Sequence, residues 1–143
     1  MFAVLSSFDI LLVPGLHDSG PGHWQTRWQR QYPTFARVVQ ESWETPDLTR
    51  CSECLHASLR PLRRQVLLVS HSFGCLATVH ALSSAGQVAG ALLVAPADPV
   101  KFGIAEQLPG TALPCPTILI SSRNDPSLAS RALSCWRATG VRD

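Results

Sequence analysis

The sequence predicts a single α/β domain with three layers, in which a mainly parallel sheet lies between helices. Three short, largely apolar runs have the composition of strands that are buried on both faces, as parallel strands are: Val66–Val69, Ala91–Ala95 and Thr117–Ile120. Segments of helix length separate these runs, which is typical of successive strand–helix–strand units. The length of 143 residues suits one domain, 1–143, that is large enough for a packed core.

Composition and charge argue against several classes of protein. Hydrophobic residues make up 45% of the chain and charged residues 15%, a globular rather than a disordered composition. The net charge of +2, without a long basic run, predicts no nucleic-acid surface. No stretch reaches the roughly 18 apolar residues of a membrane span. The five cysteines come without a basic secretion-signal start, so we expect free thiols in a reducing, cytoplasmic setting.

The N-terminal part of the chain predicts a strand, a loop and a helix. Ile10–Val13 is a short apolar run that a Pro-Gly pair ends, as expected of a buried strand. Residues 14–22 are rich in turn-forming residues and predict a loop. A helix should follow from residue 23 to about residue 31, with Trp24 and Trp28 one turn apart on its inner face.

A second strand and a second helix are expected next. Phe35–Gln40 has the composition of a short strand. The second helix should begin with Asp47 or Thr49 as its N-cap and extend to about Leu59, because a proline follows two residues later.

The pair Cys51 and Cys54 has the C-x-x-C spacing of some metal and redox motifs. No second Cys or His pair accompanies it at zinc spacing. Cys51, Leu55 and Leu59 fall on one helical face, so we interpret these residues as helix packing.

The loop after the strand Val66–Val69 carries the strongest chemical signal. Its sequence, Ser70-His71-Ser72-Phe73-Gly74, precedes a helix with regularly spaced apolar residues. A G-x-S-x-G elbow at this place holds a serine hydroxyl above the sheet at a helix N-terminus, and its flanking residues must be small. Ser70 replaces the first glycine but is small enough for the turn. We therefore predict Ser72 as a nucleophile; the alternative is a serine that only caps the helix.

Two further loops fit acyl transfer at Ser72. Asp125 follows the last predicted strand and would supply the carboxylate that orients a base, although Asp-Pro is also an ordinary start of a turn or helix. A helix bearing Leu128, Ala132 and Trp136 should follow. The backbone N–H groups of Leu16 and Phe73 would form the oxyanion hole.

Other residues around these loops are candidates for substrate contacts. His17, His23 and Trp24 follow the first strand and are predicted to bind substrate, while His23 could also cap its helix. Residues 98–115 could cover the pocket or serve as a plain surface connection. Nucleotide binding fits poorly, because neither G-x-G-x-x-G nor G-x-x-x-x-G-K-[ST] is present.

The chain resembles the small serine hydrolases related to retinoblastoma-binding protein 9 and bacterial YdeN. The resemblance covers nearly the whole chain and depends on these motifs: Pro14-Gly15-Leu16, Gly20-Pro21-Gly22-His23-Trp24, Trp43 with Pro46-Asp47, His71-Ser72-Phe73-Gly74, Val94-Ala95-Pro96-Ala97-Asp98-Pro99 and Asn124-Asp125-Pro126. It implies an α/β-hydrolase fold, no metal or cofactor, and a Ser–Asp–His triad to which this chain contributes Ser72 and Asp125. The substrate would be a small-molecule ester, thioester or amide.

The same resemblance places the catalytic histidine in a loop after a final strand, beyond the helix that holds Trp136. No histidine follows His80. We therefore expect a C-terminally shortened copy without the final strand, with impaired catalysis because a serine hydroxyl without a base is a poor nucleophile. His17 is the best substitute base. The last predicted strand would be an open sheet edge, prone to self-association. The alternative function is a non-catalytic binding or interaction protein that retains the pocket.

Overall fold

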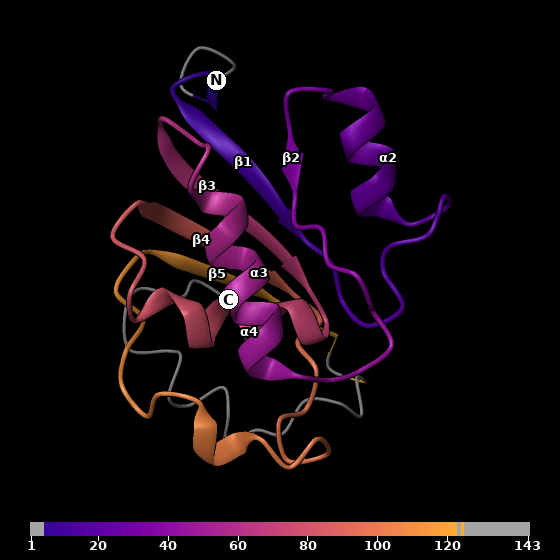
Figure 1. Cartoon of the computed structure of the whole chain (residues 1–143), viewed down its shortest axis with the longest axis vertical. Coiled ribbons are helices and arrows are strands. Elements are labelled where there is room, and N and C mark those ends of the chain that lie inside the picture. Colours follow the sequence, from indigo (N-terminus) through magenta and orange to yellow (C-terminus); the bar gives the residue numbers. More distant parts are fainter. Residues whose placement is uncertain (1–4, 123, 125–143) are drawn as a thin grey trace.

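The structure is a computed structural model that describes residues 5–122 and residue 124 (Figure 1). Its described strands are β1 (Phe8–Val13), β2 (Ala36–Arg37), β3 (Gln65–His71), β4 (Val88–Val94) and β5 (Thr117–Ile120). Its described helices are α2 (Trp24–Gln31), α3 (Leu48–Leu59), α4 (Phe73–Leu82) and the 3-10 helix η1 (Ala105–Gln107). The predicted helix bearing Leu128, Ala132 and Trp136 lies outside the described residues, and so does Asp125.

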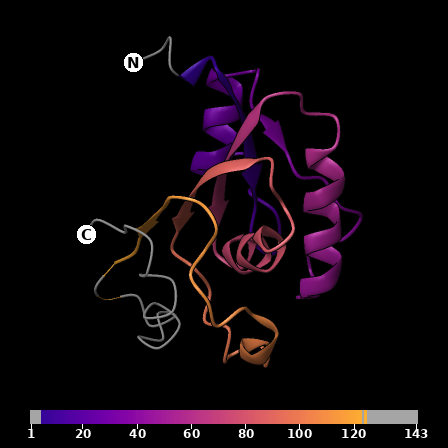
Figure 2. The same ribbon diagram turned by 90° about the vertical axis from the view of Figure 1, so that its left-hand side faces the viewer.

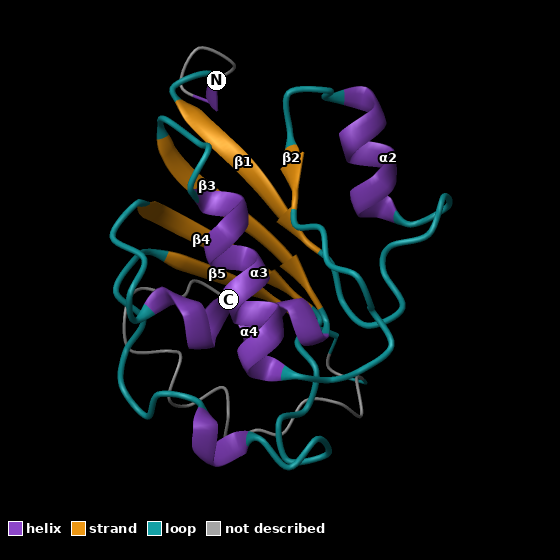
Figure 3. Ribbon diagram, in the orientation of Figure 1, coloured by secondary structure: helices purple, strands orange, loops and turns teal. Residues whose placement is uncertain are grey.

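The strands form one sheet in the order β2-β1-β3-β4-β5, and every neighbouring pair is parallel. The chain proceeds from β1 outward to β2 and then returns to the other side of β1 to form β3, so the winding direction reverses between β1 and β3. Val13 at the end of β1 lies opposite Ser70 in β3. The arrowheads of the strands point to one edge of the sheet (Figure 3). Open parallel sheets bind ligands at this edge, beside the reversal point.

Helices cover both faces of the sheet and confirm the predicted three-layer α/β architecture. The larger core lies between the sheet and the helices α3 and α4, and it includes Leu11, Leu68 and Leu76. On the opposite face, Leu12 and Val69 pack with side chains that include Trp24 of α2 and Phe35. Figure 2 shows the sheet edge-on between these layers. Alternate residues of β1 and β3 therefore enter opposite cores, which explains the apolar runs Ile10–Val13 and Val66–Val69 within these strands.

The second helix follows the sequence closely. Of the two predicted caps, Asp47 is the N-cap of α3, and its Oδ1 accepts a hydrogen bond from the Arg50 N–H at 3.0 Å. Cys51, Leu55 and Leu59 are buried on one face of α3, as predicted.

The predicted second strand, Phe35–Gln40, is longer than the strand in the structure. β2 contains Ala36 and Arg37 alone, which pair with Leu11 and Leu12. Val38 still donates its N–H to the Leu12 carbonyl at 3.0 Å, but the chain then leaves the sheet. Among the described strands, β2 pairs with β1 alone.

The inner face of α2 also differs from the prediction. Trp28 is 38% exposed, whereas Gln25 is completely buried. The amide of Gln25 donates to backbone carbonyls of two strands, β1 and β3, and apolar periodicity does not detect such contacts.

In the part of the chain that the structure describes, no helix is long and apolar enough to cross a membrane. Its four cysteines, Cys51, Cys54, Cys75 and Cys115, are free thiols. Burial raises the pKa of the Cys51, Cys75 and Cys115 thiols, so these groups stay protonated and unreactive. Within residues 5–122 and 124, no group of three His, Cys, Asp or Glu side chains could hold a metal ion.

Candidate active site

Ser72 occupies a strained turn between β3 and α4. Its backbone angles are φ 52° and ψ −122°, a conformation that residues other than glycine rarely adopt. The Ser72 N–H donates to the Val94 carbonyl at 3.1 Å, and the Ser72 carbonyl accepts from the N–H groups of Cys75 at 3.0 Å and Ala97 at 3.2 Å. Both α4 and the end of β4 thus hold this turn in place, as a strained residue at a functional position requires.

The Ser72 side chain makes no capping hydrogen bond to α4, although the residue stands at the N-cap position. The alternative that Ser72 serves only as a helix cap is therefore wrong. The hydroxyl thus stands at the N-terminus of a ten-residue helix without capping it.

Small residues around Ser72 let the elbow and the loop after β1 approach closely. A Cβ atom on Gly74 would lie 2.4 Å from the Pro14 carbonyl oxygen and 2.5 Å from that of Val13. A Cβ atom on Gly15 would lie 2.9 Å from the Cβ of Ser72. All three distances are shorter than real contacts, so neither glycine accepts a side chain without a shift of the neighbouring atoms.

Ser70, which replaces the first glycine of the elbow motif, is fully buried. Its Oγ lies 2.6 Å from the Oγ1 of Thr78 in α4, and this hydrogen bond gives each buried hydroxyl oxygen a partner. The serine thereby fits the tight turn at no cost of an unpaired buried group.

Of the two predicted oxyanion donors, one is next to Ser72 in the chain and the other follows a glycine that lies against it. Phe73 follows Ser72 at the start of α4, and Leu16 follows Gly15, whose Cα carries no side chain between the loop and Ser72. Within the described residues, the N–H groups of Leu16 and Phe73 have no hydrogen-bond partner. The positive end of the α4 dipole favours negative charge at this place.

The ring of His71, the residue before Ser72, packs against aromatic side chains and not against the Ser72 hydroxyl. The His71 ring lies 4.6 Å from the His23 ring and 6.1 Å from that of Trp24, measured between centroids. His71 therefore packs against the start of α2. Among the described residues, no histidine forms a hydrogen bond with the Ser72 hydroxyl; His17 is exposed, and its backbone N–H donates to the Trp43 carbonyl at 2.8 Å.

His23 is the N-cap of α2. Its Nδ1 accepts a hydrogen bond from the Gln25 N–H at 3.2 Å. Burial, aided by the positive charge of Arg37, lowers the pKa of His23. Burial also lowers the pKa of His71, and the proximity of His23 adds to that effect. Both rings therefore favour the neutral form.

We expect acid to lower the free energy of unfolding through His23 and His71. Because both folded-state pKa values lie below the ordinary 6.5, the unfolded chain takes up protons first as the pH falls through that value. The contribution of these two histidines to the free energy of unfolding is thus fully present above pH 6.5 and decreases below it. Protonation of His23 also removes the nitrogen lone pair that accepts the capping hydrogen bond. Thermal melts between about pH 7.5 and about pH 5.5 should show a falling Tm. His71→Gln should reduce this decrease and His56→Gln should not; equal decreases in both variants would contradict the explanation.

Sequence reasoning missed two residues that shape the loop after β1. Gln25 was overlooked because it lies between the tryptophans of α2, which were predicted to form the inner face. Its position three residues before Trp28 places it near that face, and a polar residue there was the available signal. Arg37 of β2 forms an ion pair with Asp18 and donates to the Ser19 carbonyl at 2.9 Å. Its contact could not be read from the sequence, because it joins a two-residue strand to a loop.

The remaining predicted positions lie further along the chain. Asn124 follows β5 and is exposed, while Asp125 is outside the described residues. Within residues 98–115, the Phe102 ring packs edge-on against that of Phe73 at 5.2 Å. This segment thus contacts the first residue of α4, directly beside Ser72.

Comparisons with known proteins identify the family and the fold. The family model described as serine hydrolase matches residues 10–139. A crystal structure of a protein described as a YdeN-like hydrolase, from Pectobacterium atrosepticum, superimposes with a TM-score of 0.90 and 35% sequence identity, over 98% of this chain and 78% of that one. No curated protein matches the sequence. The parallel sheet and this superposition establish the α/β-hydrolase fold, and the chain belongs to the serine hydrolase family.

Proposed function

We propose that this serine hydrolase acts by acyl transfer to Ser72 and cleaves an ester, thioester or amide of a small molecule. The observation that carries the proposal is the strained φ of 52° at Ser72, at the junction of β3 and α4 beside the point where the winding of the sheet reverses. A strained serine at this place supports a catalytic role, because such a turn would expose its hydroxyl to a bound carbonyl group.

In the proposed reaction, the Oγ of Ser72 attacks the carbonyl carbon of the substrate and gives its proton to a base. The resulting oxyanion accepts hydrogen bonds from the N–H groups of Leu16 and Phe73, which have no other partner among the described residues. Collapse of this intermediate releases the alcohol, thiol or amine and leaves an acyl group on Ser72. Water then attacks the acyl group, and the acid and free Ser72 are released. Preorganised donors of this kind are usually the largest electrostatic contribution to such a reaction.

The other predicted site residues have supporting roles in this proposal. Asp125 would orient the histidine base that the family resemblance implies. His17, His23 and Trp24 would contact the substrate; the rings of His23 and Trp24 lie against His71, the residue before Ser72. Because no described histidine bonds to the Ser72 hydroxyl, we expect residues 1–143 to turn over substrate slowly.

Labelling with a fluorophosphonate probe tests the proposal, because the probe reacts with activated serines. We expect labelling of the Ser72 peptide in the folded chain at a rate well above that of the heat-unfolded chain. Ser72→Ala should abolish this label, and Ser84→Ala, at an exposed serine elsewhere, should keep it. Oxyanion stabilisation and binding alone can contribute roughly 10³-fold without a full triad, so the difference is measurable. Equal labelling of folded and unfolded chains would contradict the proposal.

The second candidate is a non-catalytic binding or interaction protein that retains the pocket. The absence of a histidine hydrogen bond to Ser72 among the described residues favours it. Binding of a hydrolase product such as a small carboxylate, without Ser72 labelling, would support it.

Three accompanying proposals concern the setting of the protein. The four described free thiols support a reducing, cytoplasmic location. The small net charge supports a protein without a nucleic-acid partner. β5 is the last strand of the described sheet, and Ile118 and Ile120 are 56% and 51% exposed, which supports self-association along that edge. The concentration dependence of the sedimentation coefficient is the measurement for the last of these.

A further inference from the structure

Gln25 is a polar side chain with no exposed surface and three hydrogen bonds. Its Nε2 donates to the Val13 carbonyl at 3.2 Å and to the Val69 carbonyl at 3.0 Å, while its Oε1 accepts from the Ser19 Oγ at 2.6 Å. Burying an amide is costly unless its donors and acceptor are paired, and here all of them are. The position of this group is therefore well determined.

The two carbonyls belong to the strands on either side of the reversal point. Val13 is the last residue of β1 and precedes the loop that contains Gly15 and Leu16. Val69 lies in β3, three residues before Ser72. One amide group thus ties the last residue of β1, just before the proposed oxyanion loop, to a residue of β3 shortly before the elbow.

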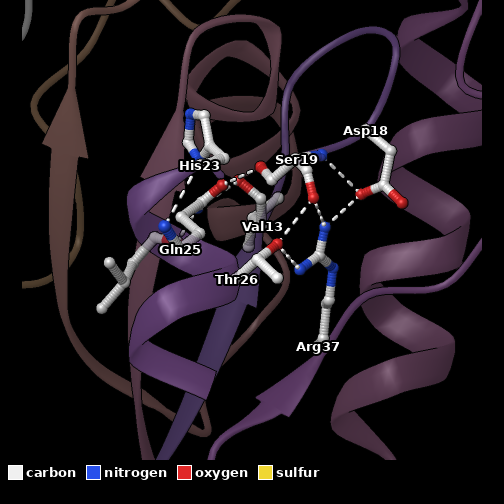
Figure 4. A network of polar contacts seen from close by, with 8 residues as sticks. Val13, Asp18, Ser19, His23, Gln25, Thr26 and Arg37 are labelled. Atoms are coloured by element: carbon white, nitrogen blue, oxygen red, sulfur yellow. Dashed lines mark hydrogen bonds and ion pairs between the residues drawn. The ribbon is translucent and has the colours of Figure 1, made fainter. Parts of the chain in front are cut away.

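The oxygen end of the same amide fixes the loop itself. Ser19, which donates to Gln25, also accepts through its carbonyl from Thr26 Oγ1 at 2.6 Å and from Arg37 at 2.9 Å. Arg37 pairs in addition with Asp18, whose carboxylate accepts from the Ser19 N–H at 2.7 Å. Figure 4 shows this network converging on the loop from α2 and β2.

We propose that Gln25 is a positioning residue for acyl transfer, one that sets the distance between the N–H of Leu16 and the elbow. The inference rests on the proposed function of Ser72 as nucleophile. Catalytic groups must be held within about 0.5 Å of their productive positions, and flexible loops need support from surrounding hydrogen bonds to reach that precision. The loop from residue 15 to residue 19 has no regular secondary structure of its own. Gln25 supplies a link between this loop and β3 through buried contacts.

A Ser72→Cys background allows a test that does not depend on a histidine base, because a thiol is partly ionised near its own pKa. Two reactions of the introduced thiol are compared by peptide-resolved mass spectrometry. With p-nitrophenyl acetate, the thiolate attacks the carbonyl carbon and expels p-nitrophenolate through an oxyanion. With iodoacetamide, the thiolate displaces iodide, and no oxyanion forms. The ratio of the first rate to the second therefore measures oxyanion stabilisation separately from thiol exposure and ionisation.

We expect Gln25→Met to lower this ratio by about tenfold or more, since loss of a single oxyanion donor costs about 10²–10³ in rate. Gln31→Met, at the exposed end of the same helix, should leave the ratio unchanged. Ser19→Ala keeps the amide donors but removes the anchor of its oxygen, and it should lower the ratio several-fold. A merely structural role would slow both reactions together or lower Tm without changing the ratio.

The outcomes separate the inference from the function on which it rests. If the introduced thiol of the Ser72→Cys chain shows no higher ratio than N-acetylcysteine, no oxyanion hole operates and the proposed function fails. If that ratio is high and Gln25→Met retains it, the positioning role is wrong. Should Gln25→Met not fold, Ser19→Ala decides: an unchanged ratio there overturns the inference, and a lowered one supports it.

Discussion

Gly74→Ala is expected to lower the free energy of unfolding by about 3 kcal/mol or more, because overpacking against rigid backbone is costly. The added methyl group would lie 2.4 Å from the Pro14 carbonyl oxygen and 2.5 Å from that of Val13. These atoms end β1 and begin the loop beside Ser72, so relief of the clash requires movement of the loop or of α4. Urea unfolding of the two chains, followed by circular dichroism, measures the difference.

Gly86→Ala is the matched control for this experiment. No atom lies within 4 Å of the position that its Cβ would occupy, and its φ is not in the left-handed region. We expect its unfolding midpoint to be close to that of the parent chain. If Gly74→Ala unfolds at the same urea concentration as Gly86→Ala, the loop after β1 does not approach the elbow as closely as described.

Local sequence rules predicted the strand–serine–helix turn because its requirements are local. An apolar strand followed by a small residue, a serine and a glycine places the serine at a strand–helix turn, and the structure has β3, Ser72 and α4 there. The sequence explained the glycine at position 74 only in part. The contact that excludes a side chain at Gly74 comes from Val13 and Pro14, which lie far away in the sequence, before α2 and α3.

The residues that the sequence did not reveal act through long-range polar contacts. Helical periodicity considers apolar side chains only, so it predicted that Trp24 and Trp28 form the inner face of α2. The completely buried residue of this helix is Gln25 instead. Its partners are carbonyl groups of β1 and β3, which no pattern within α2 can indicate. Likewise, the chain leaves β1 after Val38, which limits β2 to Ala36 and Arg37 although Phe35–Gln40 has the composition of a strand.

Base catalysis is the step for which the described structure supplies no group. His71 packs against His23 and Trp24, and no described histidine bonds to the Ser72 hydroxyl. In the printed sequence no histidine follows His80. The family resemblance implies a histidine contributed from beyond the position of Trp136. Loss of a triad histidine can cost about 10⁶-fold in turnover, so the presence of this one group should dominate the activity.

We therefore expect residues 1–143 to hydrolyse p-nitrophenyl acetate barely above background, and the same chain extended by a family C-terminal segment with its histidine to act on the order of 10⁴-fold faster or more. Ser72→Ala should abolish the gain, and so should replacement of the added histidine by glutamine, which keeps the segment but removes the base. If residues 1–143 alone show turnover that Ser72→Ala abolishes, a base lies within them, and His17→Ala identifies whether the loop after β1 provides it. The extended chain would contain a nucleophile, a base and oxyanion donors. If it folds and binds small carboxylates but stays inactive, the pocket serves binding and not catalysis.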